Sequence, residues 1–148
     1  MSSLDSDLST IRMVQPITPN EVAAGNSSEN VRDSVRKSME EMTNRFPQLV
    51  GLFEKDAGVS EGYTVGQHTE MVLGQFKKYF SEEDLPDTNL DLEDLEKAVI
   101  LHDSGKGLAV ESGEGKLAQH KYTIPILREI LPQLGFSESK LELCCELV

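Results

Sequence analysis

The sequence predicts an all-α fold, and three observations support that class. Apolar residues recur at spacings of three and four, strand-like alternation of useful length is absent, and no segment repeats another. Such spacing places apolar side chains on one face of a helix. A chain of 148 residues fits a single domain with a buried core. We therefore expect a bundle of about five to six helices.

The composition divides the chain into an arm and one domain. Residues 1–27 mix Ser, Asp, Asn, Pro and Gly with scattered apolar residues and sustain no helical period. This composition is typical of a disordered or loosely attached arm. Residues 28–148 are predicted to form one helical domain. Because the last apolar pattern runs to Val148 without a helix stop signal, we expect this domain to be truncated at its C-terminus.

The first part of the domain is predicted to pack as two helical segments. One helix begins at Ser28 or Asn30 and ends near Pro47, and a short helical turn follows over residues 49–53. Residues 55–62 contain two glycines and are predicted to form a loop. The inward face of the first helix consists of Val31, Val35, Met39 and Met42.

Two longer helices are predicted to carry a histidine each on the inward face. One spans Thr64 to Phe80, and its inward stripe is Val65, His68, Met71, Val72, Phe76, Tyr79 and Phe80. An acidic linker, residues 81–89, leads to the next helix, which begins near Asp91. Its stripe of Leu92, Leu95, Val99 and His102 places His102 at the C-terminal end, facing the core.

The remaining chain is predicted to form a flexible loop and two more helices. Four glycines between residues 105 and 115 predict the loop. A helix with the stripe Leu117, His120, Ile124, Leu127 and Leu131 follows, and Pro125 should kink or divide it. The last helix begins after Gly135, with Ser139 and Glu142 spaced as a capping box. Its apolar stripe is Leu141, Cys144, Cys145 and Val148.

Charge and composition exclude several classes of partner. A formal net charge of −12 argues against binding a nucleic acid polymer or an anionic membrane, because both require a basic surface. The chain has no run of about 18 apolar residues and no signal peptide at its start. We therefore expect a cytoplasmic protein. The adjacent cysteines Cys144 and Cys145 suit neither a disulfide nor a metal site, and we expect buried thiols.

The three histidines of the chain form the candidate metal site. His68, His102 and His120 each fall in the apolar stripe of a separate helix, and Asp103 follows His102 directly. A single buried histidine is more often a core residue with a satisfied hydrogen bond. Three of them beside a carboxylate that is costly to bury favour a divalent cation. Mixed nitrogen and oxygen ligands suit Mn, Fe, Zn or, with fewer imidazoles, Mg.

These motifs resemble those of the HD-domain superfamily of metal-dependent phosphohydrolases. The match runs from about residue 62 to the end. It rests on His68 in Val65-Gly66-Gln67-His68-Thr69, on His102-Asp103-Ser104-Gly105-Lys106, and on His120 ahead of the segment at residues 126–131. The order of parts is also kept, with residues 134–138 and 146–148 similar to later helices of that family.

The resemblance implies an HD-domain-like helical bundle, a metal centre and a reaction. His68, His102 and Asp103 would hold a divalent metal ion, and His120 would hold a second ion with Asp103 as the bridge. Asp103 would also orient the attacking water. Lys106 would stand near the phosphate, although a solvated loop lysine is the alternative. The implied substrate is a small phosphorylated molecule, with a nucleotide favoured, hydrolysed as a phosphomonoester, phosphodiester or nucleoside triphosphate.

One departure from the family keeps a second interpretation open. A final Asp ligand would be expected just beyond Val148, and Glu138, Glu142 and Glu146 are expected on a solvated face instead. The alternative is therefore a catalytically silent HD-like module that serves as a regulatory or partner-binding scaffold. The sequence leaves the substrate, the metal and the oligomeric state open.

Overall fold

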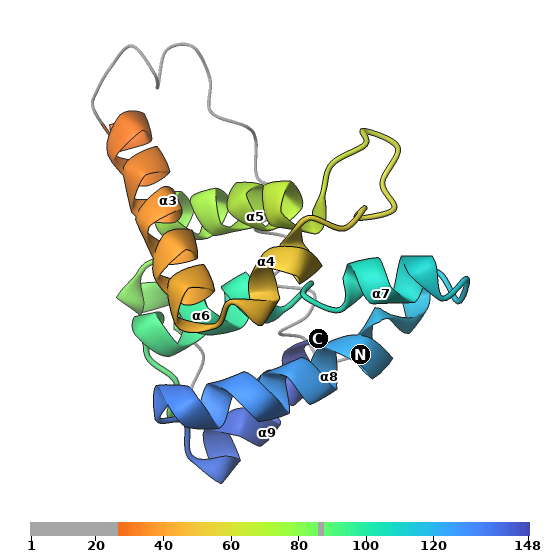
Figure 1. The fold of residues 1–148 in the computed structure, drawn as a ribbon. Helices are drawn as coiled ribbons and strands as arrows, with labels where there is room; N and C mark the ends of the chain where they lie inside the picture. Colours follow the sequence, from red (N-terminus) through yellow and green to blue (C-terminus); the bar gives the residue numbers. More distant parts are fainter. Residues whose placement is uncertain (1–26, 86–87) are drawn as a thin grey trace.

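The computed structural model describes residues 27–85 and 88–148, and within them all regular structure is helical (Figure 1). The only strand-like feature of these residues is an isolated antiparallel bridge between Asp56 and Thr64. The predicted all-α class is therefore confirmed. The predicted arm, residues 1–27, lies outside the described residues except for its last member. No helix in the described part is long and apolar enough to cross a bilayer.

Long helices and short helical turns together make up most of the described chain. In chain order they are α3 (Ser27–Arg45), α4 (Gln48–Phe53), α5 (Val65–Tyr79), η1 (Glu82–Asp84), α6 (Leu92–Leu101), α7 (Lys106–Glu111), η2 (Lys116–Ala118), α8 (Gln119–Ile130), η3 (Leu131–Leu134) and α9 (Glu138–Leu147). Figure 1 shows α3 crossing α5 on one side of the molecule, with α8 and α9 on the opposite side. Helices α6 and α7 lie between these two layers.

Helix α5 begins at a capping box that fixes the direction of His68. Thr64 Oγ1 accepts the backbone N–H of Gln67 at 3.1 Å, and the Gln67 side chain accepts the N–H of Thr64 at 2.9 Å. These bonds satisfy two backbone donors of the first turn. His68 then faces the core and is 8% exposed.

The inward face of α5 is displaced from the predicted stripe. Met71 and Tyr79 are exposed, whereas Thr69 and Leu73 are fully buried. Met71 and Tyr79 lie at the edge of the apolar face, and periodicity alone does not show which edge residues the neighbouring helices cover.

Helix α6 delivers His102 and Asp103 to the interior, as predicted. Asp91 caps its first turn, accepting the N–H of Asp94 at 2.8 Å, and the Asp94 side chain accepts the N–H of Asp91 at 3.2 Å. The helix ends at Leu101, and His102 is its C-cap residue. Asp103 therefore follows the last turn directly.

The segment after Asp103 is helical, so the prediction of a flexible loop over the four glycines was wrong in its first half. Helix α7 begins at Lys106, with Gly105 as its N-cap. A Cβ at Gly107 would overlap the side chain of Lys55, so this glycine permits close packing. Of these four glycines, only Gly113 and Gly115 need the conformational freedom of glycine, because their φ angles are +82° and +81°.

The last helices test two of the predictions. Helix α8 continues through Pro125, so of the two predicted effects, a kink or a division, the division does not occur. The capping residue of α9 is Ser137, whose side chain accepts the N–H of Lys140, and not Ser139 as predicted. Cys144 and Cys145 are free and buried, which confirms the prediction of buried thiols.

Candidate metal centre

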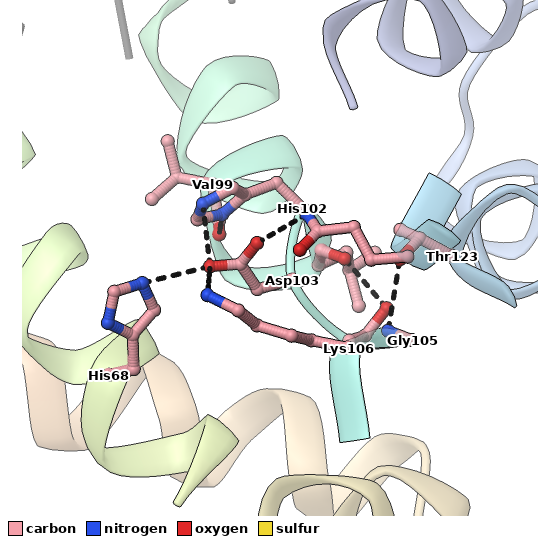
Figure 2. A network of polar contacts seen from close by, with 10 residues as sticks. His68, Val99, His102, Asp103, Gly105, Lys106 and Thr123 are labelled. Atoms are coloured by element: carbon pink, nitrogen blue, oxygen red, sulfur yellow. Dashed lines mark hydrogen bonds and ion pairs between the residues drawn. The ribbon is translucent and has the colours of Figure 1, made fainter. Parts of the chain in front are cut away.

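The candidate site is built around the carboxylate of Asp103, which is only 3% exposed. Its Oδ2 atom lies 3.0 Å from Nε2 of His68 and 3.2 Å from Nε2 of His102 (Figure 2). His68 comes from α5, while His102 and Asp103 come from the end of α6. The structure thus brings together three of the four predicted metal ligands.

The imidazole of His102 is oriented by a backbone carbonyl. Its Nδ1 lies 2.5 Å from the carbonyl oxygen of Val99, one turn earlier in α6. Because a carbonyl oxygen only accepts, Nδ1 must carry the hydrogen and donate it. In the neutral ring, Nε2 then has a free lone pair directed toward Asp103. A histidine that donates one N–H to a carbonyl is the usual arrangement for metal ligation through the other nitrogen.

Lys106 adds a positive charge to the site from within the protein. Its side chain is buried, with an exposed fraction of 6%, and its Nζ lies 3.8 Å from Asp103 Oδ2 (Figure 2). The alternative of a solvated loop lysine is therefore wrong. A buried ammonium group requires a compensating charge, and Asp103 provides it.

The close charges shift two pKa values in the site. Burial raises the pKa of the Asp103 carboxyl, but the charges of His102 and Lys106 and the contact with His68 outweigh burial, so this pKa lies well below its usual value. Burial lowers the pKa of His102, but the charge of Asp103 outweighs it, so the pKa of His102 is raised. Asp103 is therefore ionised and available as an anionic ligand.

The second oxygen of Asp103 is held by a residue that the sequence analysis missed. Gln119 donates from Nε2 to Asp103 Oδ1 at 2.8 Å. It is the first residue of α8 and is half-buried. Its neighbour His120, predicted on the inward stripe, is exposed, so that prediction was wrong. The buried residues of α8 are Thr123, Leu127 and Ile130, so its inward face includes Gln119 and leaves His120 outside.

The chain around Asp103 is tied closely to α8. The N–H of Gly105 donates to Thr123 Oγ1 at 3.1 Å, and Thr123 is fully buried (Figure 2). A Cβ at position 105 would lie 2.5 Å from the carbonyl carbon of Tyr122. Only glycine allows this approach of two backbones. The position of α8 relative to Asp103 is thereby fixed.

The nitrogen and oxygen atoms of the site are of the types that bind divalent cations. His68 Nε2 and Asp103 Oδ2 are both buried, and neither has a well-aligned hydrogen-bond partner although the two atoms are neighbours. Buried polar atoms without a hydrogen bond of good geometry are uncommon, and an ion is one explanation for them. Donors at about 2.1 Å from an octahedral cation lie roughly 3.0 Å apart, close to the two distances found here.

The arrangement as a whole is not that of a preformed metal site. Within residues 27–85 and 88–148, no group of three or more His, Cys, Asp and Glu side chains is placed so that it could hold a metal ion. The distances from Asp103 Oδ2 to the two imidazole nitrogens suit a shared cation. However, His68, His102 and Lys106 all approach this same oxygen. A cation would therefore require a rearrangement of the side chains around Asp103.

The acidic residues of α9 do not approach this site as replacement ligands. Glu138, Glu142 and Glu146 are exposed, as predicted. Glu142 accepts from Arg128 at 2.5 Å, which joins α8 to α9 at the surface.

Comparisons with known proteins give no relatives. No family model matches the chain, and neither the curated proteins nor the solved structures contain a match.

Proposed function

We propose that the protein is a metal-dependent phosphohydrolase that acts on a phosphomonoester, a phosphodiester or a nucleotide. The observation that carries this proposal is the approach of two imidazole nitrogens, from His68 and His102, to one oxygen of the buried Asp103. Two neutral nitrogens and one carboxylate form a ligand set for Mn, Fe or Zn, and Mg is the oxygen-preferring alternative. The resemblance to the HD-domain superfamily supports the same reaction.

Each residue of the site would have a separate task. A divalent cation bound there would polarise the phosphoryl group and lower the pKa of water. His68 and His102 would supply nitrogen ligands, and Asp103 would supply the charged ligand and orient the attacking water. Lys106 would donate from its ammonium group to a phosphoryl oxygen. His120 would take part only if a second ion were bound, from its exposed position at the start of α8.

A catalytically silent module that serves as a regulatory or partner-binding scaffold is the second candidate. Two observations favour it. Lys106 lies close enough to Asp103 to balance its charge without a metal ion. The described residues also contain no preformed group of metal ligands.

The deciding experiment is a hydrolysis assay supplemented with manganese, iron or zinc. Substrates are p-nitrophenyl phosphate, bis(p-nitrophenyl) phosphate and a panel of nucleoside mono- and triphosphates. The proposal predicts hydrolysis that Asp103→Asn reduces by about 10²-fold or more. Asp33→Asn is the matched control, because Asp33 is an exposed aspartate paired with Arg36 on α3.

In the same assay, the kcat and kcat/KM of Lys106→Met show whether Lys106 acts in the chemical step or only in substrate binding. Loss of an ammonium group that contacts the phosphoryl oxygen should lower kcat and kcat/KM together, because charge develops on that oxygen during the reaction. If no substrate is hydrolysed in an Asp103-dependent manner and no metal ion binds, the silent module is the correct interpretation.

A further inference from the structure

The two carboxylate oxygens of Asp103 contact different residues, and the contact to Oδ1 identifies a further residue of the site. Oδ2 faces the two imidazoles and Lys106. Oδ1 accepts the side-chain amide of Gln119 at 2.8 Å. The χ2 torsion of an aspartate, which rotates the carboxylate, has a broad distribution and is only weakly restrained by the side chain itself. A directional bond to one oxygen therefore decides where the other oxygen points.

The position of Gln119 is fixed by the fold. Gln119 begins α8, and Thr123 lies one turn later on the same face of the helix. Thr123 accepts the N–H of Gly105, two residues after Asp103. A Cβ at Gly105 would overlap atoms of Tyr122 and Thr123, so the two backbones are in direct contact near the start of α8.

We propose that Gln119 is a positioning residue that holds Asp103 with one oxygen directed to the cation. Its amide would keep Oδ1 occupied, so that Asp103 binds the cation through Oδ2 alone. This inference rests on the proposed function, since it assigns Gln119 a role toward the same metal ion. Hydrogen bonds to ligating carboxylates typically change metal affinity by about 10–100-fold when they are removed.

The first test measures Mn²⁺ affinity by calorimetry in the parent and two variants. Gln119→Met keeps the length of the side chain and removes the donor. Gln48→Met is the matched control, because Gln48 also begins a helix, α4, and donates to a carboxylate, that of Glu129, at 3.1 Å. We expect Gln119→Met to weaken Mn²⁺ binding about 10–100-fold, and Gln48→Met to leave it unchanged.

The outcomes separate this inference from the proposed function. If the parent binds Mn²⁺ and Gln119→Met binds it equally well, the positioning role is wrong and the proposed function stands. If the parent binds neither Mn²⁺, Fe²⁺ nor Zn²⁺, the proposed function fails and the positioning role fails with it. A general loss of stability in Gln119→Met would appear in its melting temperature, which we expect to match that of Gln48→Met.

A second readout needs no substitution at Gln119. In the ¹⁵N-labelled parent, added Zn²⁺ should shift the side-chain amide signals of Gln119, because the acceptor oxygen belongs to a ligand. The amide signals of Gln48 should stay in place. Saturation with Zn²⁺ that leaves the Gln119 signals unmoved would overturn the proposal even if Gln119→Met does not fold.

Discussion

Gly105 donates its N–H to Thr123 Oγ1, and the two backbones approach so closely that no Cβ fits between them. This contact holds the turn that carries Asp103 against the helix that carries Gln119. The glycine is therefore required by packing, although its φ of −91° is accessible to any residue.

The first prediction concerns this contact. Gly105→Ala should destabilise the protein by about 1–3 kcal/mol, because a methyl group forces α8 away from the Asp103 turn. Gly51→Ala is the control. Gly51 lies in α4, and a Cβ at this position would meet no other atom within 4 Å, so the change should stabilise by about 0.4–1 kcal/mol. Urea unfolding of both variants measures the difference, and equal stabilities would contradict the predicted clash.

The second prediction concerns the acceptor of that contact. Thr123→Val keeps the shape of the side chain but leaves the N–H of Gly105 buried without a partner. An unsatisfied buried donor costs about 1–3 kcal/mol. Chemical denaturation should show this loss, and hydrogen exchange at the Gly105 amide should accelerate. An unchanged exchange rate would mean that Thr123 does not protect this amide.

The third prediction concerns metal-dependent stability. A ligand that binds only the folded protein stabilises it by about 2.7 kcal/mol at a hundredfold excess over Kd. Manganese should therefore raise the melting temperature of the parent, and His102→Ala should abolish the rise. His120→Ala distinguishes one bound ion from two, since it keeps the full rise if His68, His102 and Asp103 hold a single ion. A His102→Ala protein that responds as the parent does would identify His102 as an ordinary core histidine.

The fourth prediction concerns pH and the pair formed by Asp94 and Lys140. Asp94 is 8% exposed, and Lys140 donates to it at 2.9 Å, which joins α6 to α9. Burial raises the pKa of Asp94, but the bond from Lys140 and the backbone bond from Asp91 outweigh it, so the pKa is below 3.8.

The sign of the pH effect follows from this lowered pKa. The pair stabilises the fold above pH 3.8, the value in the unfolded chain, and the stabilisation is lost as the pH falls through the lower folded-state pKa. The parent should therefore lose stability on acidification more steeply than Asp94→Asn, measured by thermal unfolding between neutral pH and pH about 2.5. Parallel curves for the two proteins would exclude a contribution from Asp94.

The fifth prediction concerns the adjacent cysteines. Burial raises the pKa of the Cys144 thiol to about 12, and burial also raises the pKa of Cys145. The reactive thiolate is therefore scarce at a pH of about 8, and both thiols should resist a disulfide reagent in the native protein. Both should react at once in urea. Rapid reaction without denaturant would show that the end of α9 opens easily.

The sequence predicted the parts of the fold that local chemistry determines. The starts of α5 and α6 follow from Thr64 and Asp91, whose side chains cap the first turns. The inward positions of His68 and His102 followed from helical spacing within long, regular helices. The metal-ligand assignment itself stays a prediction.

The errors occurred where contacts with other segments decide the structure. Gly107 looked like a loop glycine, but it leaves room for Lys55, which is 52 positions earlier in the chain (107 minus 55). Gln119 and His120 are neighbours, and only the face that α8 buries, with Thr123, Leu127 and Ile130, shows which of the two turns inward. Helical spacing of Gln119 with Thr123 and Leu127 was the one signal in the sequence that could have indicated it.

The bond between Gln119 and Asp103 joins segments 16 residues apart, and the contact from His68 spans a longer stretch of chain. Contacts between segments that are distant in the chain cost loop-closure entropy before they form, so we expect those around Asp103 to be largely absent from the folding transition state. Substitutions at Gln119 should then accelerate unfolding while leaving the folding rate nearly constant. The centre of the site would be completed last during folding and would set how long the native molecule persists.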